Sequence, residues 1–375
     1  HGRRTTDEEN QRLNKMEARF LMIIEKSASR MVEIQVEHPI KVMIGLLLVT
    51  ALILPGALQM EIKPSTEAVL PEDDNSVQAL DDLRSKFYGD STLIVFESED
   101  VRNVELMKDV ERIENRLLRK ENIKQVNSPV DIVKMQYGEI PESKDKLNQV
   151  DYRETVSKDY GTMVVTVSAD TQANSDEIQK LNDDINQALE TVGRKDQATL
   201  TGYNMIDLAT FQVIIQDFIR ITGVSFLAVM GVLYATFRDI KKMLLPLSVV
   251  MFGLFWMIGL GGWLGADLTI ISMVSAAMIM GLGIDFGIHV TKKFYKTQGG
   301  QDGLSQTMVE LSRGLVGASF TTAVGFLALL FAELAGMHSL GIFLFTGIIA
   351  SYIGSTVMLP TLIILIEGKN SFKID

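Results

Sequence analysis

Apolar residues gather in six long runs that charged or polar segments separate. Each run holds about 17–30 residues, and a helix of about 20 residues crosses the ~30 Å hydrocarbon core of a bilayer. The chain is therefore predicted to be a polytopic α-helical membrane protein with six transmembrane helices. The runs lie between Lys41 and Glu61, Arg220 and Arg238, Met243 and Ala266, Asp267 and Lys292, Arg313 and Glu333, and Leu340 and Ile366.

The stretch 61–207, between the first and second runs, has a different pattern. Short segments rich in β-branched residues alternate with longer segments of helical periodicity, and a polar connector lies around 127–160. This order predicts a separate α+β domain whose helices cover one face of an antiparallel or mixed sheet. The strand-like segments are 92–98, 162–170 and 197–204, and the helical ones are 104–120 and 175–192.

Lysine and arginine in the short loops predict the orientation in the membrane. The segments after the second, fourth and sixth runs are basic, whereas 261–267 and 332–339 contain no Lys or Arg. Basic loops stay on the cytoplasmic side of a membrane. The protein is therefore expected in the cytoplasmic membrane, with both termini in the cytoplasm. The predicted parts are a cytoplasmic amphipathic helix (9–38), transmembrane helix 1 (40–60), an extracytoplasmic α+β domain (61–207), transmembrane helices 2–6 (208–368) and a cytoplasmic tail (369–375).

The predicted helix 9–38 carries apolar residues at helical spacing among several arginines and lysines. Such a helix can lie along the cytoplasmic surface of the membrane. The alternative is a helix that only packs against the transmembrane helices.

Composition limits the chemistry. The chain is 47% hydrophobic and 22% charged, with a net charge of -11, and the stretch 61–207 holds most of the acidic excess. That excess is expected to keep the domain solvated, and no nucleic-acid partner is predicted. The absence of cysteine excludes disulfides and thiolate metal sites. Without a phosphate loop, a nucleophile elbow or metal-ligand spacing, neither an enzyme nor a cofactor or metal site is predicted.

One carboxylate interrupts the fourth apolar run, in the sequence GLGIDFGIH at 281–289. A charged Asp against lipid costs about 2.5–3.5 kcal/mol. Asp285 therefore needs polar partners or a proton, because burial favours the neutral form of a carboxyl group. A group that alternates between these two states carries protons, so Asp285 is the candidate proton relay. The alternative is a buried Asp that only holds helices together.

The neighbours of Asp285 fit such a role. His289 lies four residues later on the same helix face and is the side chain that titrates most easily near neutral pH. Gly281, Gly283 and Gly287 make the helix thin, which allows another helix or water to approach. His289 can also be a hydrated residue near the interface, with no further role.

The fifth run offers hydroxyl groups in the sequence SFTT at 319–322. Ser319, Thr321 and Thr322 can hydrogen-bond a carboxyl group in either protonation state. The alternative is that these hydroxyls bond to the carbonyl groups of their own helix.

The layout resembles one half of a resistance–nodulation–division (RND) transporter. The resemblance rests on GLGIDFGIH, LPEDDNSVQALDDLRSKF (70–87), LTGYN (200–204) and ASFTTAVGFLAL (318–329), and covers the chain from about residue 30. It is greatest to the hydrophobe/amphiphile efflux branch, which includes hopanoid and mycobacterial lipid exporters of the MmpL type. This implies a porter-like outer domain and proton-driven export of lipids or other amphiphiles, with Asp285 as the relay.

Two features depart from that family. Many relatives have Tyr after the relay Asp, whereas Phe286 has no hydroxyl, so His289 or the hydroxyls of the fifth run would have to supply the polar partner. Typical members also contain two related halves, and this sequence shows no internal repeat. A half-sized chain can rebuild the full arrangement as a homodimer about a twofold axis. The expected partners are a second copy, membrane lipids, the amphiphilic substrate and protons.

Two other functions remain open. A SecD/SecF-like protein-export helper shares the layout, and so does a non-transporting, sterol-sensing or receptor-like membrane protein. The motifs around 70–87 and 281–289 are more similar to those of the lipid-handling branch, and Asp285 argues against a receptor.

Overall fold

The computed structural model describes residues 19, 22–63, 70–71, 74–76, 78–79, 91–152, 155–169, 175–297 and 300–367. Most of the motif 70–87, the first part of the predicted helix 9–38 and the tail 369–375 lie outside the described residues. The chain forms two compact units, 1–70 with 215–375 and 71–214. The first unit is a helical bundle and the second is an α+β unit.

Six helices among the described residues are long and apolar enough to cross a membrane, as the sequence predicts. The fold prediction is confirmed: the α+β unit follows the first of these helices and precedes the others. The helices, with their 3-10 or π extensions, are α2–η1 (Pro39–Ile53, Leu54–Gln59), α8 (Tyr203–Phe237), α9 (Ile240–Trp263), η4–α10 (Ser272–Val274, Ser275–Phe294), α11–η5 (Gly300–Leu327, Ala328–Phe331) and α12–η6–α13 (Ala335–Ile353, Gly354–Met358, Leu359–Glu367).

Helices α9, α10 and α12 form the interior of the bundle, whereas α2, α8 and α11 bury few of their residues. Because α2 is apolar on every side, specific contacts with α9 decide how it packs. The two backbones approach so closely that a Cβ on Gly262 would lie 1.9 Å from the carbonyl oxygen of Gly56. Trp256 Nε1 also donates to Thr50 Oγ1 at 2.9 Å. Glycine contacts and an indole hydrogen bond therefore fix the first transmembrane helix.

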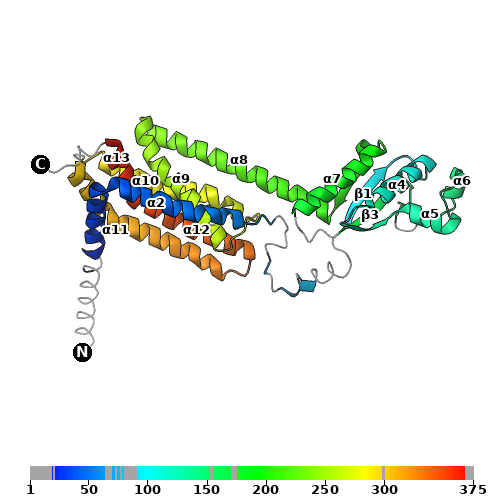
Figure 1. Cartoon of the computed structure of the whole chain (residues 1–375), viewed down its shortest axis with the longest axis horizontal. Helices are drawn as coiled ribbons and strands as arrows, with labels where there is room; N and C mark the ends of the chain where they lie inside the picture. The colour runs from blue at the N-terminus through cyan, green and yellow to red at the C-terminus, as the bar shows by residue number, and fades with distance from the viewer. Residues whose placement is uncertain are drawn as a thin grey trace, which may run out of the picture. The chain divides into compact units, whose positions relative to one another are not determined.

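One end of the bundle, which we call the basic end, brings charged residues of several helices together. Lys293 of α10 forms an ion pair with Glu310 of α11, and Lys242 of α9 lies over the ring of Tyr295, 4.6 Å from its centroid. The N-terminal helix, residues 22–37, is at this end. Figure 1 shows it in dark blue, lying across the end of the bundle rather than continuing α2.

At the opposite end, the chain leaving α2–η1 pairs with the loop between α9 and α10. Ile62 and Leu268 form a parallel β-bridge, with the Leu268 amide donating to Glu61 at 2.8 Å and the Lys63 amide donating to Leu268 at 3.0 Å. Lys63 Nζ also lies 2.7 Å from Asp267 Oδ2. The segment that follows α2–η1 is therefore attached to the loop that precedes η4–α10.

The α+β unit has a four-stranded antiparallel sheet in the order β2-β3-β1-β4. Alternate residues of β1 and β3 are buried beneath helices, which is the period of a sheet with one covered face. The other face is half-exposed. The elements are β1 (Ser91–Glu97), α4 (Val104–Leu117), β2 (Ile123–Asn127), α5 (Pro129–Tyr137), α6 (Lys144–Leu147), β3 (Thr162–Ala169), α7 (Ser175–Thr191), η3 (Lys195–Gln197) and β4 (Ala198–Gly202).

The segment expected to be a polar connector contains α5 and α6. Ser128 caps α5 by accepting a hydrogen bond from the Val130 amide, and Asp131 completes the capping box. Ser128 Oγ also donates to Glu114 Oε2 of α4 at 3.3 Å. Burial, followed by the nearby Asp131 charge, raises the pKa of Glu114 to about 7. A short capped helix with only three buried residues has too little apolar periodicity to stand out in the sequence.

Candidate functional site

The candidate site is a stripe along α10 that the rest of the bundle leaves uncovered. Residues on the other face of this helix are buried against α9, α11 and α12. The exposed residues recur every three or four positions, so they lie on one side of the helix. They are Met278, Gly281, Leu282, Asp285, His289 and Lys292, and we call them the open face of α10.

Glycines fix which side of α10 faces inward. A Cβ on Gly287 would lie 2.8 Å from Pro246 Cα of α9, and one on Gly283 would lie 2.6 Å from Ser351 Oγ of α12. Real side-chain atoms do not approach this closely, so only glycine allows these helices to pack so near to one another. A Cβ on Gly281 would meet nothing within 4 Å. The three predicted packing glycines therefore divide into two that contact other helices and one on the open face.

Asp285 projects from α10 on the open face, ten residues after the first residue of the helix and seven before Lys292. At 1.5 Å per residue these intervals are about 15 Å and 10 Å. The carboxylate is thus far from both ends of a transmembrane helix. Within the described part of the chain, Asp285 has no hydrogen bond or ion pair. A charged carboxylate that faces hydrocarbon at this depth costs about 2.5–3.5 kcal/mol.

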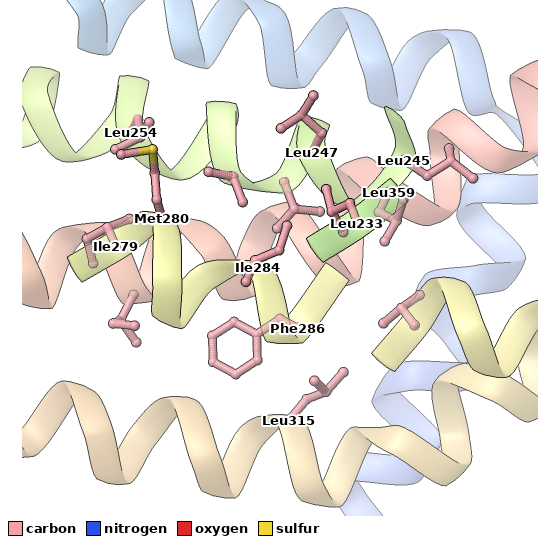
Figure 2. Close-up of a cluster of buried hydrophobic side chains, with 14 of the residues drawn as sticks. Leu233, Leu245, Leu247, Leu254, Ile279, Met280, Ile284, Phe286, Leu315 and Leu359 are labelled. Carbon is pink, nitrogen blue, oxygen red and sulfur yellow. The ribbon is translucent and has the colours of Figure 1, made fainter. Parts of the chain in front are cut away.

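His289 follows one turn later on the open face and is also exposed, so α10 does bring it alongside Asp285. Phe286 points the other way. It is 7% exposed and belongs to the hydrophobic core of the bundle. Figure 2 shows its ring between α10 and α11, near Leu315. Phe286 therefore packs α10 against α11, and a hydroxyl at its position would enter an apolar core.

The hydroxyl groups of α11 bond to their own helix. Ser319 is buried and donates to the Val316 carbonyl at 3.1 Å. Thr321 is exposed and donates to the Gly317 carbonyl at 2.8 Å. Thr322 is half-buried. The described residues show no hydrogen bond from these three side chains to Asp285 or His289.

Sequence reasoning did not identify Ser351 of α12. Its side chain is fully buried and its Oγ has no hydrogen-bond partner among the described residues. It fills the space left by Gly253 of α9 and Gly283 of α10. The only signal in the sequence is a serine between Gly347 and Gly354 in an apolar run. Ser351 is thus the contact through which three interior helices meet. Its neighbour on α10, Gly283, is two residues before Asp285 in the chain.

The site contains no arrangement suited to a metal ion. Among the residues that the structure describes, no three His, Asp or Glu side chains gather as metal ligands. The open face instead places the carboxyl group of Asp285 one helical turn from the imidazole of His289.

Six long apolar helices with one inserted α+β unit define a polytopic membrane protein. The chain belongs to the MMPL family, within the RND superfamily, whose family model matches residues 68–373. This range includes the α+β unit and α10 with Asp285. Membership of a transporter family agrees with the prediction that the chain is not an enzyme. The RND assignment is confirmed, and the hydrophobe/amphiphile efflux branch remains a prediction.

A curated relative is similar over most of both chains. It is the protein named "Putative membrane protein MJ1562" of Methanocaldococcus jannaschii, with 25% identity over 355 residues. The similarity covers 88% of this chain and 92% of the relative.

Proposed function

We propose that the protein is a proton-driven exporter of hydrophobic or amphiphilic molecules, lipids among them. The observation that carries the proposal is the carboxyl group of Asp285, which lies deep within a transmembrane helix and has no partner in the described part of its own bundle. Exchange of a proton changes the charge of this group, so it changes how favourably α10 faces an apolar or a polar environment. That difference can bias two conformations of the bundle.

The working unit in this proposal is a homodimer. The open face of α10 combines a small residue, an acid and a histidine, which is a costly surface to present to lipid. A second copy related by a twofold axis covers it with its own open face and brings two Asp285 residues near one another. The relative from Methanocaldococcus jannaschii supports this. The similarity to this chain covers 92% of the relative, so the relative also has too few further residues to contain a second such half.

The energy of proton movement limits how the substrate travels. A proton yields about 2.3 kcal/mol per 100 mV and about 1.4 kcal/mol per pH unit. Moving a fourteen-carbon chain fully into water costs about 11 kcal/mol. A few protons only approach that cost. The substrate's apolar part is therefore expected to remain covered while it moves.

The proposed topology places the basic end in the cytoplasm, with both termini, and 61–207 outside. This topology is supported by the distribution of Lys and Arg. Arg238, Lys241 and Lys242 lie just before or at the start of α9. The loops 261–267 and 332–339, at the opposite end, contain no Lys or Arg.

The test uses the purified full-length chain in liposomes with an imposed pH gradient. Wild type should take up protons, faster when an amphiphile is added, and Asp285→Asn should abolish that uptake. The matched control is Asp302→Asn, which removes an exposed acid from the first turn of α11. Equal flux in wild type and Asp285→Asn refutes the relay. No flux in wild type favours a receptor, and flux coupled only to a translocating polypeptide favours a SecD/SecF-like helper.

The homodimer is tested by cysteine crosslinking, which is clean because the chain has no cysteine. Leu282→Cys on the open face should form a disulfide-linked dimer in active proteoliposomes. Leu52→Cys, on the exposed side of α2, should not. Crosslinking at neither position, together with monomers only by native mass analysis, refutes the dimer.

A further inference from the structure

The N-terminal helix, residues 22–37, carries a second feature that the proposed transport does not use. It ends at Glu37, His38 is not helical, and α2 begins at Pro39. Proline favours the first position of a helix and disfavours a helical residue before it. The chain therefore turns at this point, and the helix lies across the basic end rather than extending α2 (Figure 1).

Specific contacts fix the rotation of this helix about its own axis. Gln35 is 1% exposed, and its Nε2 donates to the Thr356 carbonyl at 3.1 Å and the Val357 carbonyl at 3.4 Å. These carbonyls belong to the π segment η6, where the regular helical hydrogen bonding is interrupted. Glu25 also forms an ion pair with Arg313 of α11 at 2.8 Å. One side of the helix is thus held by the bundle.

The opposite side is exposed and combines apolar with basic residues. Ile23 is 63% exposed and Ile34 is 50% exposed. Arg30 and Ile34 are seven and eleven residues after Ile23, respectively. This spacing places all three residues on one stripe of the helix. Lys26 lies beside this stripe and is also exposed. Neither Lys26 nor Arg30 has an ion pair among the described residues. We call Ile23, Lys26, Arg30 and Ile34 the outer stripe.

We propose that the outer stripe binds the headgroup region of the membrane through anionic lipids. A helix that crosses the end of a transmembrane bundle and is joined directly to a transmembrane helix is expected at the level of the headgroups. There, isoleucine side chains can reach the acyl boundary while lysine and arginine contact lipid phosphates. An aqueous protein partner fits less well, because the membrane surface already adjoins this stripe.

Two exposed acids lie in the later half of the helix, Glu33 and Glu37. The basic residues of the stripe are in the earlier half, toward the free end. The charge therefore predicts that anionic headgroups gather near Lys26 and Arg30 rather than along the whole helix. It also supplies a matched control, since Glu33→Gln removes a charge of the opposite sign from the same helix.

Position in the membrane is tested with single-cysteine spin labels on the full-length chain, which has no native cysteine. Labels at Ile23→Cys and Ile34→Cys should collide more with oxygen than with a water-soluble nickel chelate in phosphatidylglycerol-containing liposomes. A label at Glu105→Cys, exposed on α4, is the aqueous control. If all three labels show the same aqueous access, the proposal is overturned.

Lipid preference is tested by native mass spectrometry with phosphatidylglycerol and phosphatidylcholine. Neutralising Lys26→Gln or Arg30→Gln should weaken phosphatidylglycerol binding about fivefold each, as expected for one basic residue near an anionic surface. Glu33→Gln should leave it unchanged or strengthen it, and phosphatidylcholine binding should not respond to any of the three. Unchanged phosphatidylglycerol binding in both basic variants overturns the proposal. Neither experiment depends on proton transport, so its outcome is separate from that of the proposed function.

Discussion

Replacing Gly287 by alanine should destabilise the bundle, whereas the same change at Gly281 should not. A Cβ at position 287 would lie 2.8 Å from Pro246 Cα and 2.9 Å from Pro246 Cβ. Carbon atoms in contact are about 3.5–4.0 Å apart, so α9 and α10 have to separate. Because the obstacle is a proline within a helix, no side-chain rotation can relieve it.

The magnitude follows from two opposing effects. Alanine in a helix interior is favoured over glycine by about 1 kcal/mol, and overpacking a core costs about 1–3 kcal/mol. Gly287→Ala should therefore lower the free energy of unfolding by up to about 2 kcal/mol, while Gly281→Ala should raise it by up to about 1 kcal/mol. Gly283→Ala should fall between them, because the nearest atom is the hydroxyl of Ser351, at 2.6 Å. Adding Ser351→Ala to Gly283→Ala removes that atom and should restore part of the lost stability.

The assay is unfolding of the full-length chain in mild detergent, followed by proton uptake in liposomes. From most to least stable, the expected order is Gly281→Ala, wild type, Gly283→Ala and Gly287→Ala. Proton uptake should fall in Gly287→Ala, because α10 carries Asp285. If Gly287→Ala is as stable as Gly281→Ala, the two helices do not meet at Pro246, and the assignment of the open face of α10 loses its basis.

Two further changes test the rest of the molecule. Glu114 is 7% exposed and its pKa is raised to about 7, so the folded protein holds a proton that the unfolded chain releases near its ordinary value of 4.5. The stability of the wild type should therefore fall as the pH rises from about 4.5 through 7. Between pH 5 and pH 8, the free energy of unfolding of Glu114→Gln should increase by about 2–3 kcal/mol relative to that of the wild type. Equal pH slopes in urea unfolding would contradict this. Gln35→Leu leaves the Thr356 and Val357 carbonyls without their side-chain donor, so it should cost about 1–3 kcal/mol and speed hydrogen exchange of the N-terminal helix. Unchanged exchange would show that Gln35 does not hold it.

Much of the architecture was evident from local pattern. Six apolar runs predict six transmembrane helices because a bilayer of fixed thickness admits few other structures. The segments rich in β-branched residues at 92–98 and 162–170 predict the strands β1 and β3. The short helix α5 was missed, since its boundaries depend on capping by Ser128 and Asp131 rather than on a long apolar stripe.

The candidate site divides in the same way. Asp285 stands out in the sequence because an acid is rare in an apolar run, and His289 follows from helical spacing. The hydroxyls of Ser319 and Thr321 illustrate the limit of such reasoning. The sequence allows them to bond either to a neighbouring carboxyl group or to their own backbone, and the structure shows the second.

The sequence by itself determined which segments enter the membrane, which segment lies between them as an α+β unit, and which helix carries an acid. The direction in which each face of α10 points was decided only in the tertiary structure. The sequence places Asp285, His289 and Lys292 on one side of α10, but it does not determine whether other helices of the bundle cover that side. Here the choice lies in Gly283 against Ser351 and Gly287 against Pro246, contacts between residues far apart in the chain, and these leave Asp285 on the uncovered side.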